Sequence, residues 1–359
     1  MTEHAEEQQT STDRRRFLQT GALAGAAALV GGSGTADAQT SAATPRVAAV
    51  PMTAEAEATP PADVQVLSAD QRCGSDFMVD VIKSLDFEFV CANPGSSFRG
   101  LHESIINYGG NRAPELITCL HEESSIAMAH GYFKAEGKPL AVMAHGTVGL
   151  QHASMAIYNA WCDRVPVYLI LGNHSDAALR RSAEWYHGVQ DAALMVRDYT
   201  KWDDTPWSLT HFAESAIRGY KVALTPPMAP VVLVLDGHLQ EEPIPKSASL
   251  PVPRLTLPSP PQGDSAAVEE TARLLVDAEF PVIVADRYAR TAEGMRLLVE
   301  LAESLQAAVI DQGSRMNFPS RHPLNQSERG GAMIAQADVV LGLELVDYWA
   351  TVNSLRDQL

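Results

Sequence analysis

Short, almost wholly apolar segments separated by helical stretches constrain this fold more than any other feature of the sequence. Five of them occupy residues 87–92, 115–120, 139–144, 166–172 and 230–236. A strand that is apolar throughout, instead of alternating, is typical of a parallel sheet that is covered on both faces. Repeated strand–helix–strand units require right-handed crossovers. The pattern therefore predicts an α/β protein with doubly wound, mainly parallel sheets.

The stretches between the apolar segments have helical periodicity. Residues 74–85 predict a helix with Ser75 as its N-cap. Residues 122–134 predict a second helix, which Gly137 ends. The stretch 146–161 predicts a third helix, so rich in Ala, Ser and Gly that another backbone can approach it closely.

A proline-rich stretch divides the chain. Residues 67–240 carry the first series of strands and helices, and residues 241–264 predict an extended linker between domains. Residues 265–359 predict a smaller α/β domain, without a GxGxxG or GxxxxGK[ST] motif. Because the chain stops shortly after an apolar strand, we expect this second domain to be truncated.

The N-terminal residues 1–38 have the order of features of an export signal. A DRRRFL sequence precedes a run of Gly and Ala, and an A-x-A cleavage site ends at Ala38. The paired arginines resemble a twin-arginine signal, which predicts export to the bacterial periplasm. The alternative is a basic disordered tail on a cytoplasmic protein. Residues 39–66 are rich in Ala, Pro, Thr and Glu and predict a disordered linker.

The composition limits the partners. A net charge of -17 argues against nucleic acid. Outside the N-terminus no apolar run is long enough to cross a membrane, so no membrane contact is expected after signal cleavage. The four cysteines lack the spacing of a metal site, and no metal ligands are predicted. Cys91, Cys119 and Cys162 lie in or beside apolar segments, which favours buried free thiols over a disulfide.

Side chains capable of chemistry follow the predicted strands, where open α/β sheets place their sites. Glu122 opens a helix just after one strand, His145 and Gly146 end another, and Ser96 follows the first strand. Each has a simpler explanation. A glutamate in the first turn meets the helix dipole, a strand-end histidine bonds to backbone, and a serine caps a helix.

The sequence HEESSIAMAHGYFKAEGKP, which begins at His121, resembles the helix of thiamine-diphosphate-dependent enzymes that starts with their catalytic glutamate. The sequence NAWCDRVPVYLILGN resembles the next helix and strand of these enzymes. The resemblance covers about residues 70–350. It corresponds to the pyrimidine-binding and central domains of the acetolactate synthase and decarboxylase superfamily, and most closely to the benzoylformate decarboxylases.

Three residues carry that narrower resemblance. Ser96, in an NPGS turn, matches a serine that meets the substrate carboxylate. Glu122 matches the glutamate that activates the cofactor, and His145 matches a histidine used in proton transfer. The resemblance also implies that Pro94 and Gly146 contact the cofactor.

Two features depart from the family. Where the decarboxylases have a second active-site histidine, the sequence LVDYWATV offers Trp349. No GDG motif followed by an asparagine appears. We therefore expect the diphosphate-binding domain to be absent, and Mg²⁺, which that domain holds, to bind only where it is present.

The resemblance implies a reaction type. A glutamic acid in an apolar pocket shares a proton with the aminopyrimidine ring and so promotes loss of the thiazolium C2 proton. The cofactor then serves as the electron sink. We expect a 2-oxo acid to be decarboxylated, or its acyl carbanion transferred, by a homo-oligomer or with a partner chain that carries the diphosphate site. The alternatives are an acetolactate-synthase-like carboligase with FAD in its central domain, and a non-catalytic module.

Overall fold

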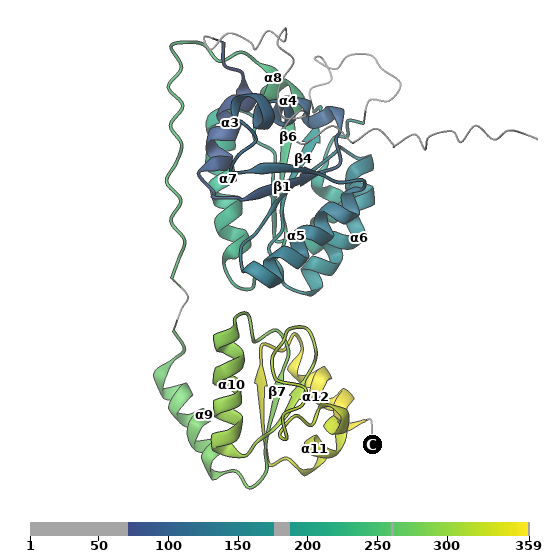
Figure 1. Cartoon of the computed structure of the whole chain (residues 1–359), viewed down its shortest axis with the longest axis vertical. Helices are drawn as coiled ribbons and strands as arrows, with labels where there is room; N and C mark the ends of the chain where they lie inside the picture. Colours follow the sequence, from purple (N-terminus) through teal and green to yellow (C-terminus); the bar gives the residue numbers. More distant parts are fainter. Residues whose placement is uncertain (1–70, 176–186, 260–261, 358–359) are drawn as a thin grey trace, which may run out of the picture. The chain divides into compact units, whose positions relative to one another are not determined.

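The computed structural model describes residues 71–175, 187–259 and 262–357 (Figure 1). The predicted signal peptide, 1–38, and the predicted linker, 39–66, lie outside these described residues. Within them, no helix combines the length and the apolar character needed to cross a membrane. Two separate parallel sheets are present, each with its own helices. We call the part from α3 to α8 the first module and the part from α9 to α12 the second module.

The first module has six parallel strands in the order β2-β1-β3-β4-β6-β5. Every residue of β3, β4 and β6 is buried, as the uniformly apolar sequences require. This sheet confirms the predicted doubly wound α/β fold. The strands are β1 (Phe89–Ala92), β2 (Glu115–Thr118), β3 (Ala141–Ala144), β4 (Tyr168–Asn173), β5 (Trp202–Asp204) and β6 (Val231–Asp236).

Helices cover both faces of the first sheet. Figure 1 shows α3 and α7 on one face and α5 and α6 on the other, and each pair packs on its own apolar core. The helices of this module are α3 (Gly74–Lys83), η1 (Ser96–Phe98), α4 (Arg99–Glu103), η2 (Ser104–Tyr108), α5 (Glu122–Glu136), α6 (Val148–Cys162), η3 (Ala193–Tyr199), α7 (Leu209–Leu224) and α8 (Gly237–Glu241).

Predictions of helix ends and cysteine burial from local sequence patterns were partly confirmed. Gly137 ends α5 in the left-handed conformation, with φ 71°, as predicted. Ser75 was wrongly predicted as the N-cap of α3, because the extended backbone conformation that a cap needs falls on Cys73, which places Ser75 inside the helix. All four cysteines are free, but Cys162 is exposed, since it ends α6 on the solvent side.

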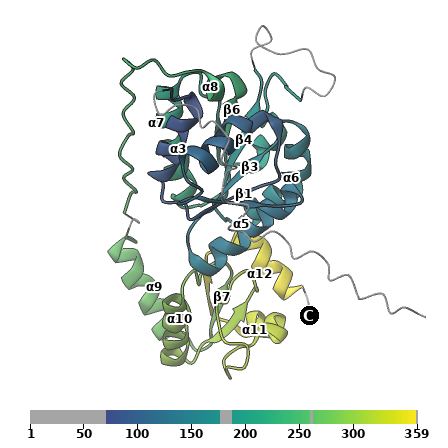
Figure 2. The same cartoon turned by 45° about the horizontal axis from the view of Figure 1, so that its top comes forward.

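The second module has three parallel strands in the order β8-β7-β9. Figure 2 shows α10 and α11 on opposite sides of β7. Its apolar cores lie on the two faces of β7, one with α10 and one with α11 and α12. In the proline-rich stretch before it, Ile244, Leu250 and Leu255 pack on the core of the first module. The elements are α9 (Ser265–Asp277), β7 (Pro281–Ala285), α10 (Ala292–Leu305), β8 (Ala308–Asp311), η4 (Ser327–Arg329), α11 (Gly330–Gln336), β9 (Val339–Leu343) and α12 (Tyr348–Arg356).

Candidate active site

The strand order of the first sheet reverses at β1, which has β2 on one side and β3 on the other. At such a reversal the loops that leave the carboxyl ends diverge and form a crevice where α/β proteins bind ligands. The loop after β1 contains Ser96 and Ser97, and the loop after β3 contains His145 and Gly146. The predicted residues therefore leave adjacent strands at the reversal.

Ser97 joins these two loops. Its Oγ lies 2.7 Å from Nδ1 of His145 and accepts a 2.9 Å hydrogen bond from the backbone N–H of Gly146. Ser97 is buried, whereas the predicted Ser96 is exposed. With the Gly146 N–H bonded to its oxygen, Ser97 can donate its own hydrogen to Nδ1. This favours the histidine tautomer that carries its proton on Nε2.

The surroundings of His145 favour a neutral imidazole. Burial lowers the pKa of His145, and the nearby His187 lowers it further, while Glu122 acts in the opposite direction. The His187 ring meets the His145 ring edge-on, with 5.0 Å between centroids. A neutral, half-buried imidazole at the carboxyl end of a strand can accept a proton from a substrate.

A strained turn follows His145. Thr147 has φ 54° and ψ -74°, and the N–H of Val148 donates to the carbonyl of Gly146 over 2.7 Å, which makes this a γ-turn. The Thr147 hydroxyl donates to the carbonyl of His187 at 2.8 Å. A positive φ is rare for a β-branched residue. Such strain, on the order of 1–3 kcal/mol, is concentrated at functional sites.

Glu122 begins α5 and is 3% exposed. Its Oε2 is a buried atom without a hydrogen-bond partner among the described residues, and the nearest basic atom, Nδ1 of His152, is 3.5 Å away. Gly149 of α6 gives this carboxylate its space, because a Cβ there would lie 2.7 Å from Oε1. An unpaired buried oxygen costs about 1–3 kcal/mol. Its retention indicates a ligand site.

The other predicted residues have simpler surroundings. Pro94 is exposed at the turn after β1. Gly146 packs against β4, where a Cβ would lie 2.5 Å from the carbonyl oxygen of Gly172. Trp349, in α12 of the second module, is 75% exposed. Ser97, His121 and His152 were not among the site residues predicted from the sequence.

Comparisons with known proteins show the fold and the proteins that this chain resembles. Residues 72–194 match the family described as thiamine pyrophosphate enzyme, N-terminal TPP binding domain. Two solved structures have the same fold at 23% identity, a putative thiamin diphosphate-dependent enzyme from Mycobacterium smegmatis (TM-score 0.63) and benzoylformate decarboxylase from Polynucleobacter necessarius (TM-score 0.65). Each match covers 76% of this chain, and 52% and 50% of the respective structures.

Curated relatives agree with this assignment. Benzoylformate decarboxylase from Pseudomonas aeruginosa is 29% identical over 62% of this chain and 44% of its own length. Sulfoacetaldehyde acetyltransferase from Rhodobacter capsulatus is 27% identical over 64% of this chain and 41% of its own length. The acetolactate synthase large subunit of Lactococcus lactis is 24% identical over 63% of this chain and 39% of its own length. The matches thus span less than half of these relatives. Residues 72–194 thus resemble the N-terminal TPP binding domain of thiamine pyrophosphate enzymes.

Proposed function

We propose that Glu122 receives the aminopyrimidine of thiamine pyrophosphate and that the chain serves the conversion of 2-oxo acids. The observation that carries this proposal is the buried, unpartnered Oε2 of Glu122 at the carboxyl edge of a doubly wound sheet. The resemblance of residues 72–194 to this family supports the same cofactor. Thiamine pyrophosphate, when bound, supplies the electron sink that cleavage of a 2-oxo acid requires.

The residues of the crevice have distinct roles in this proposal. Glu122 offers an oxygen that has no other partner, so it can share a proton with a ring nitrogen. His145, held by Ser97, takes up and returns a proton at Nε2. Ser96, which precedes Ser97, is exposed and can donate its hydroxyl to a substrate carboxylate. Gly149 keeps the approach to Glu122 open.

The names of the relatives support two reaction types. Benzoylformate decarboxylase favours decarboxylation of an aromatic 2-oxo acid. Sulfoacetaldehyde acetyltransferase and acetolactate synthase favour acyl transfer, and FAD belongs to the synthase-like variant of the proposal. Release of CO₂ from benzoylformate without an acceptor would support the first. An acyl product that forms only with an acceptor aldehyde or 2-oxo acid would support the second.

We further propose that the active form is an oligomer and that it is exported. Leu120, Met155 and Tyr158 are exposed apolar side chains near the start of α5 and along α6, and a second copy would cover them. Light scattering on the chain tests the first point. Mass spectrometry of periplasmic protein tests the second, because cleavage after Ala38 removes the signal.

The decisive test compares Glu122→Gln with Glu123→Gln. Exposed Glu123 is the adjacent residue of the same helical turn and serves as the matched control. The measurement is made together with a chain that carries the diphosphate site, at saturating thiamine pyrophosphate and Mg²⁺, and proton exchange at C2 is followed by NMR. We expect Glu122→Gln to lose about 10²–10⁴-fold of the acceleration and Glu123→Gln to keep it. Equal acceleration in wild type and Glu122→Gln would remove Glu122 from this role.

A further inference from the structure

Two imidazoles flank the buried carboxylate of Glu122. His121 is the N-cap of α5, and His152 lies on α6. Their rings stack, with 4.6 Å between centroids and 13° between planes. One ligand atom from each of the three residues can be chosen so that all lie within 4.8 Å of one another. Two histidines and a carboxylate form a set that binds zinc and other first-row divalent ions.

The distance between His152 and Glu122 suits a shared ion better than a direct bond. The separation of 3.5 Å between Nδ1 and Oε2 exceeds the usual hydrogen-bond distance of about 2.7–3.2 Å. Two ligand atoms about 2.0–2.1 Å from a tetrahedral ion are about 3.3 Å apart. The buried Oε2 lacks a hydrogen-bond partner in the described part of the chain. A cation at this position would satisfy it.

The histidines can adjust to an ion at little structural cost. The His152 side chain is 57% exposed and is therefore able to rotate. His121 accepts one long hydrogen bond, 3.2 Å from the backbone N–H of Glu123, and this contact is given up if its Nδ1 turns to the ion. The backbone of both helices can stay in place.

We propose that His121, Glu122 and His152 bind a divalent transition-metal ion, with zinc as the model ion and a fourth position open to water. Bound metal occupies the oxygen that the aminopyrimidine needs, so ion and cofactor exclude each other. The proposed metal site is inferred from the geometry of these three residues alone. The competition between the ion and thiamine pyrophosphate also rests on the proposed function.

The experiment is a zinc titration of the full chain without a histidine tag, in competition with a chromophoric chelator. We expect one site, and a loss of affinity of at least about tenfold in His152→Ala and in Glu122→Gln. His238→Ala is the matched control, because His238 is also a half-exposed histidine near a glutamate, 3.8 Å from Glu242. Affinity unchanged in His152→Ala, or lowered equally in His238→Ala, would overturn the site.

Cobalt provides a second measurement. Co²⁺ in a tetrahedral site of nitrogen and oxygen ligands absorbs visible light, and His152→Ala should remove that absorption. With a chain that carries the diphosphate site present, at cofactor concentrations where C2 exchange shows that thiamine pyrophosphate is bound, the cofactor should weaken zinc binding to the wild-type chain. Zinc binding that is unaffected by the cofactor would contradict the competition between ion and cofactor, but it would not contradict the metal site itself. If the chain binds no zinc but C2 exchange still depends on Glu122, the metal site is wrong and the proposed function remains supported.

Discussion

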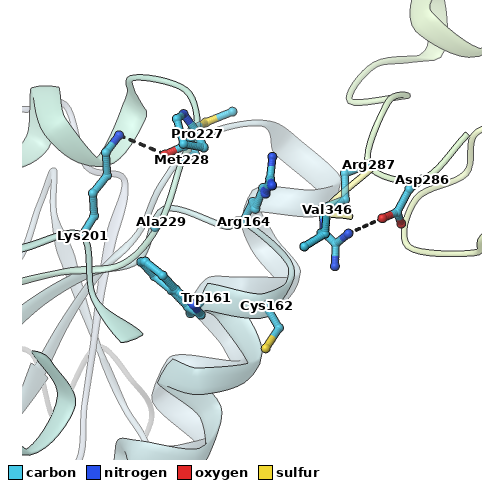
Figure 3. Close-up of a pocket in the computed structure, with 10 residues that line it drawn as sticks. All are labelled: Trp161, Cys162, Arg164, Lys201, Pro227, Met228, Ala229, Asp286, Arg287 and Val346. Atoms are coloured by element: carbon cyan, nitrogen blue, oxygen red, sulfur yellow. Dashed lines mark hydrogen bonds and ion pairs between the residues drawn. The ribbon is translucent and has the colours of Figure 1, made fainter. Parts of the chain in front are cut away.

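The two modules share one architecture but treat the carboxylates at their strand ends differently. In each sheet a strand with neighbours on both sides marks the reversal, β1 in the first module and β7 in the second. In the second module Asp311 accepts hydrogen bonds from the N–H groups of Gly313 (2.8 Å) and Phe318 (3.2 Å) and from the amide of Asn317 (2.8 Å). Asp286 pairs with Arg287 (Figure 3).

The first module leaves one such oxygen unpaired. Glu122 is nearly as buried as Asn317, at 3% against 0%, yet Oε2 of Glu122 has no hydrogen-bond partner in the described residues. Burial alone therefore does not identify a site. The contrast concerns carboxylates only, because Nε of Arg287 in the second module is also buried without a hydrogen-bond partner in the described residues. The unpaired carboxylate makes Glu122 the candidate ligand group.

The largest expected effect tests the paired side of the comparison. Asn317 accepts from the N–H of Ala289 (2.9 Å) and donates to the carbonyl of Asp286 (2.6 Å) and to Asp311. Asn317→Ala should lower the free energy of unfolding by about 3 kcal/mol, because several buried groups lose their partner. Urea denaturation measures it. Asn353→Ala, which removes one exposed hydrogen bond, should cost less than about 0.5 kcal/mol.

A second test concerns the close packing of the first site. A Cβ on Gly172 would lie 2.2 Å from Oγ and 2.6 Å from the backbone carbon of Ser97. Gly172→Ala should therefore destabilise the chain by about 1–3 kcal/mol. In the second module Gly294 has room for a Cβ in helix α10, and Gly294→Ala should stabilise by about 0.5–1 kcal/mol. Thermal unfolding of both variants should show shifts of opposite sign.

A third test replaces the unpaired group itself. Glu122→Leu removes a buried oxygen without breaking a hydrogen bond to the described residues. The free energy of unfolding should stay unchanged or rise by up to about 1 kcal/mol. The variant also loses the favourable interaction of the Glu122 carboxylate with the dipole of α5, which offsets part of the gain in stability. A loss above about 1 kcal/mol would show that the carboxylate has a structural partner, and would end the contrast with Asn317.

The smallest effect is a dependence on pH. Burial lowers the pKa of His145 below its usual 6.5, so the unfolded chain binds this proton more tightly than the folded chain. The contribution of neutral His145 to the free energy of unfolding is complete above pH 6.5. It is lost as the pH falls toward the lowered pKa of His145 in the folded chain. His145→Gln should lose less stability than wild type between about pH 7.5 and about pH 5.5. Urea titrations at both pH values should differ by less than about 1 kcal/mol, because the ring is only half-buried.

Much of the fold was predictable from the sequence. Uniformly apolar strands predicted a parallel sheet, and a glycine at position 137 predicted the end of α5, because both signals are local. The position of Glu122 at the start of a helix shortly after a strand was also predictable. The chain from Ser104 to Tyr108 forms a π-helical turn, which no local signal in the sequence predicts.

The missed site residues depend on contacts between distant segments. Ser96 and Ser97 are identical neighbours in the sequence, and only the turn of η1 decides that Ser97 faces His145. His152 reaches Glu122 because α5 and α6 pack together through Gly149. A helical pattern shows that a face is polar or small, but not which residue of another helix lies opposite.

The γ-turn at Thr147 has a consequence for cooperativity. A backbone in a sparsely populated conformation persists only where its surroundings fix it. Here the hydrogen bond from Thr147 to the carbonyl of His187 is one of those restraints. A ligand that holds His187 in this position therefore also stabilises the placement of His145. By thermodynamic linkage, occupancy at His145 stabilises the His187 segment to the same degree.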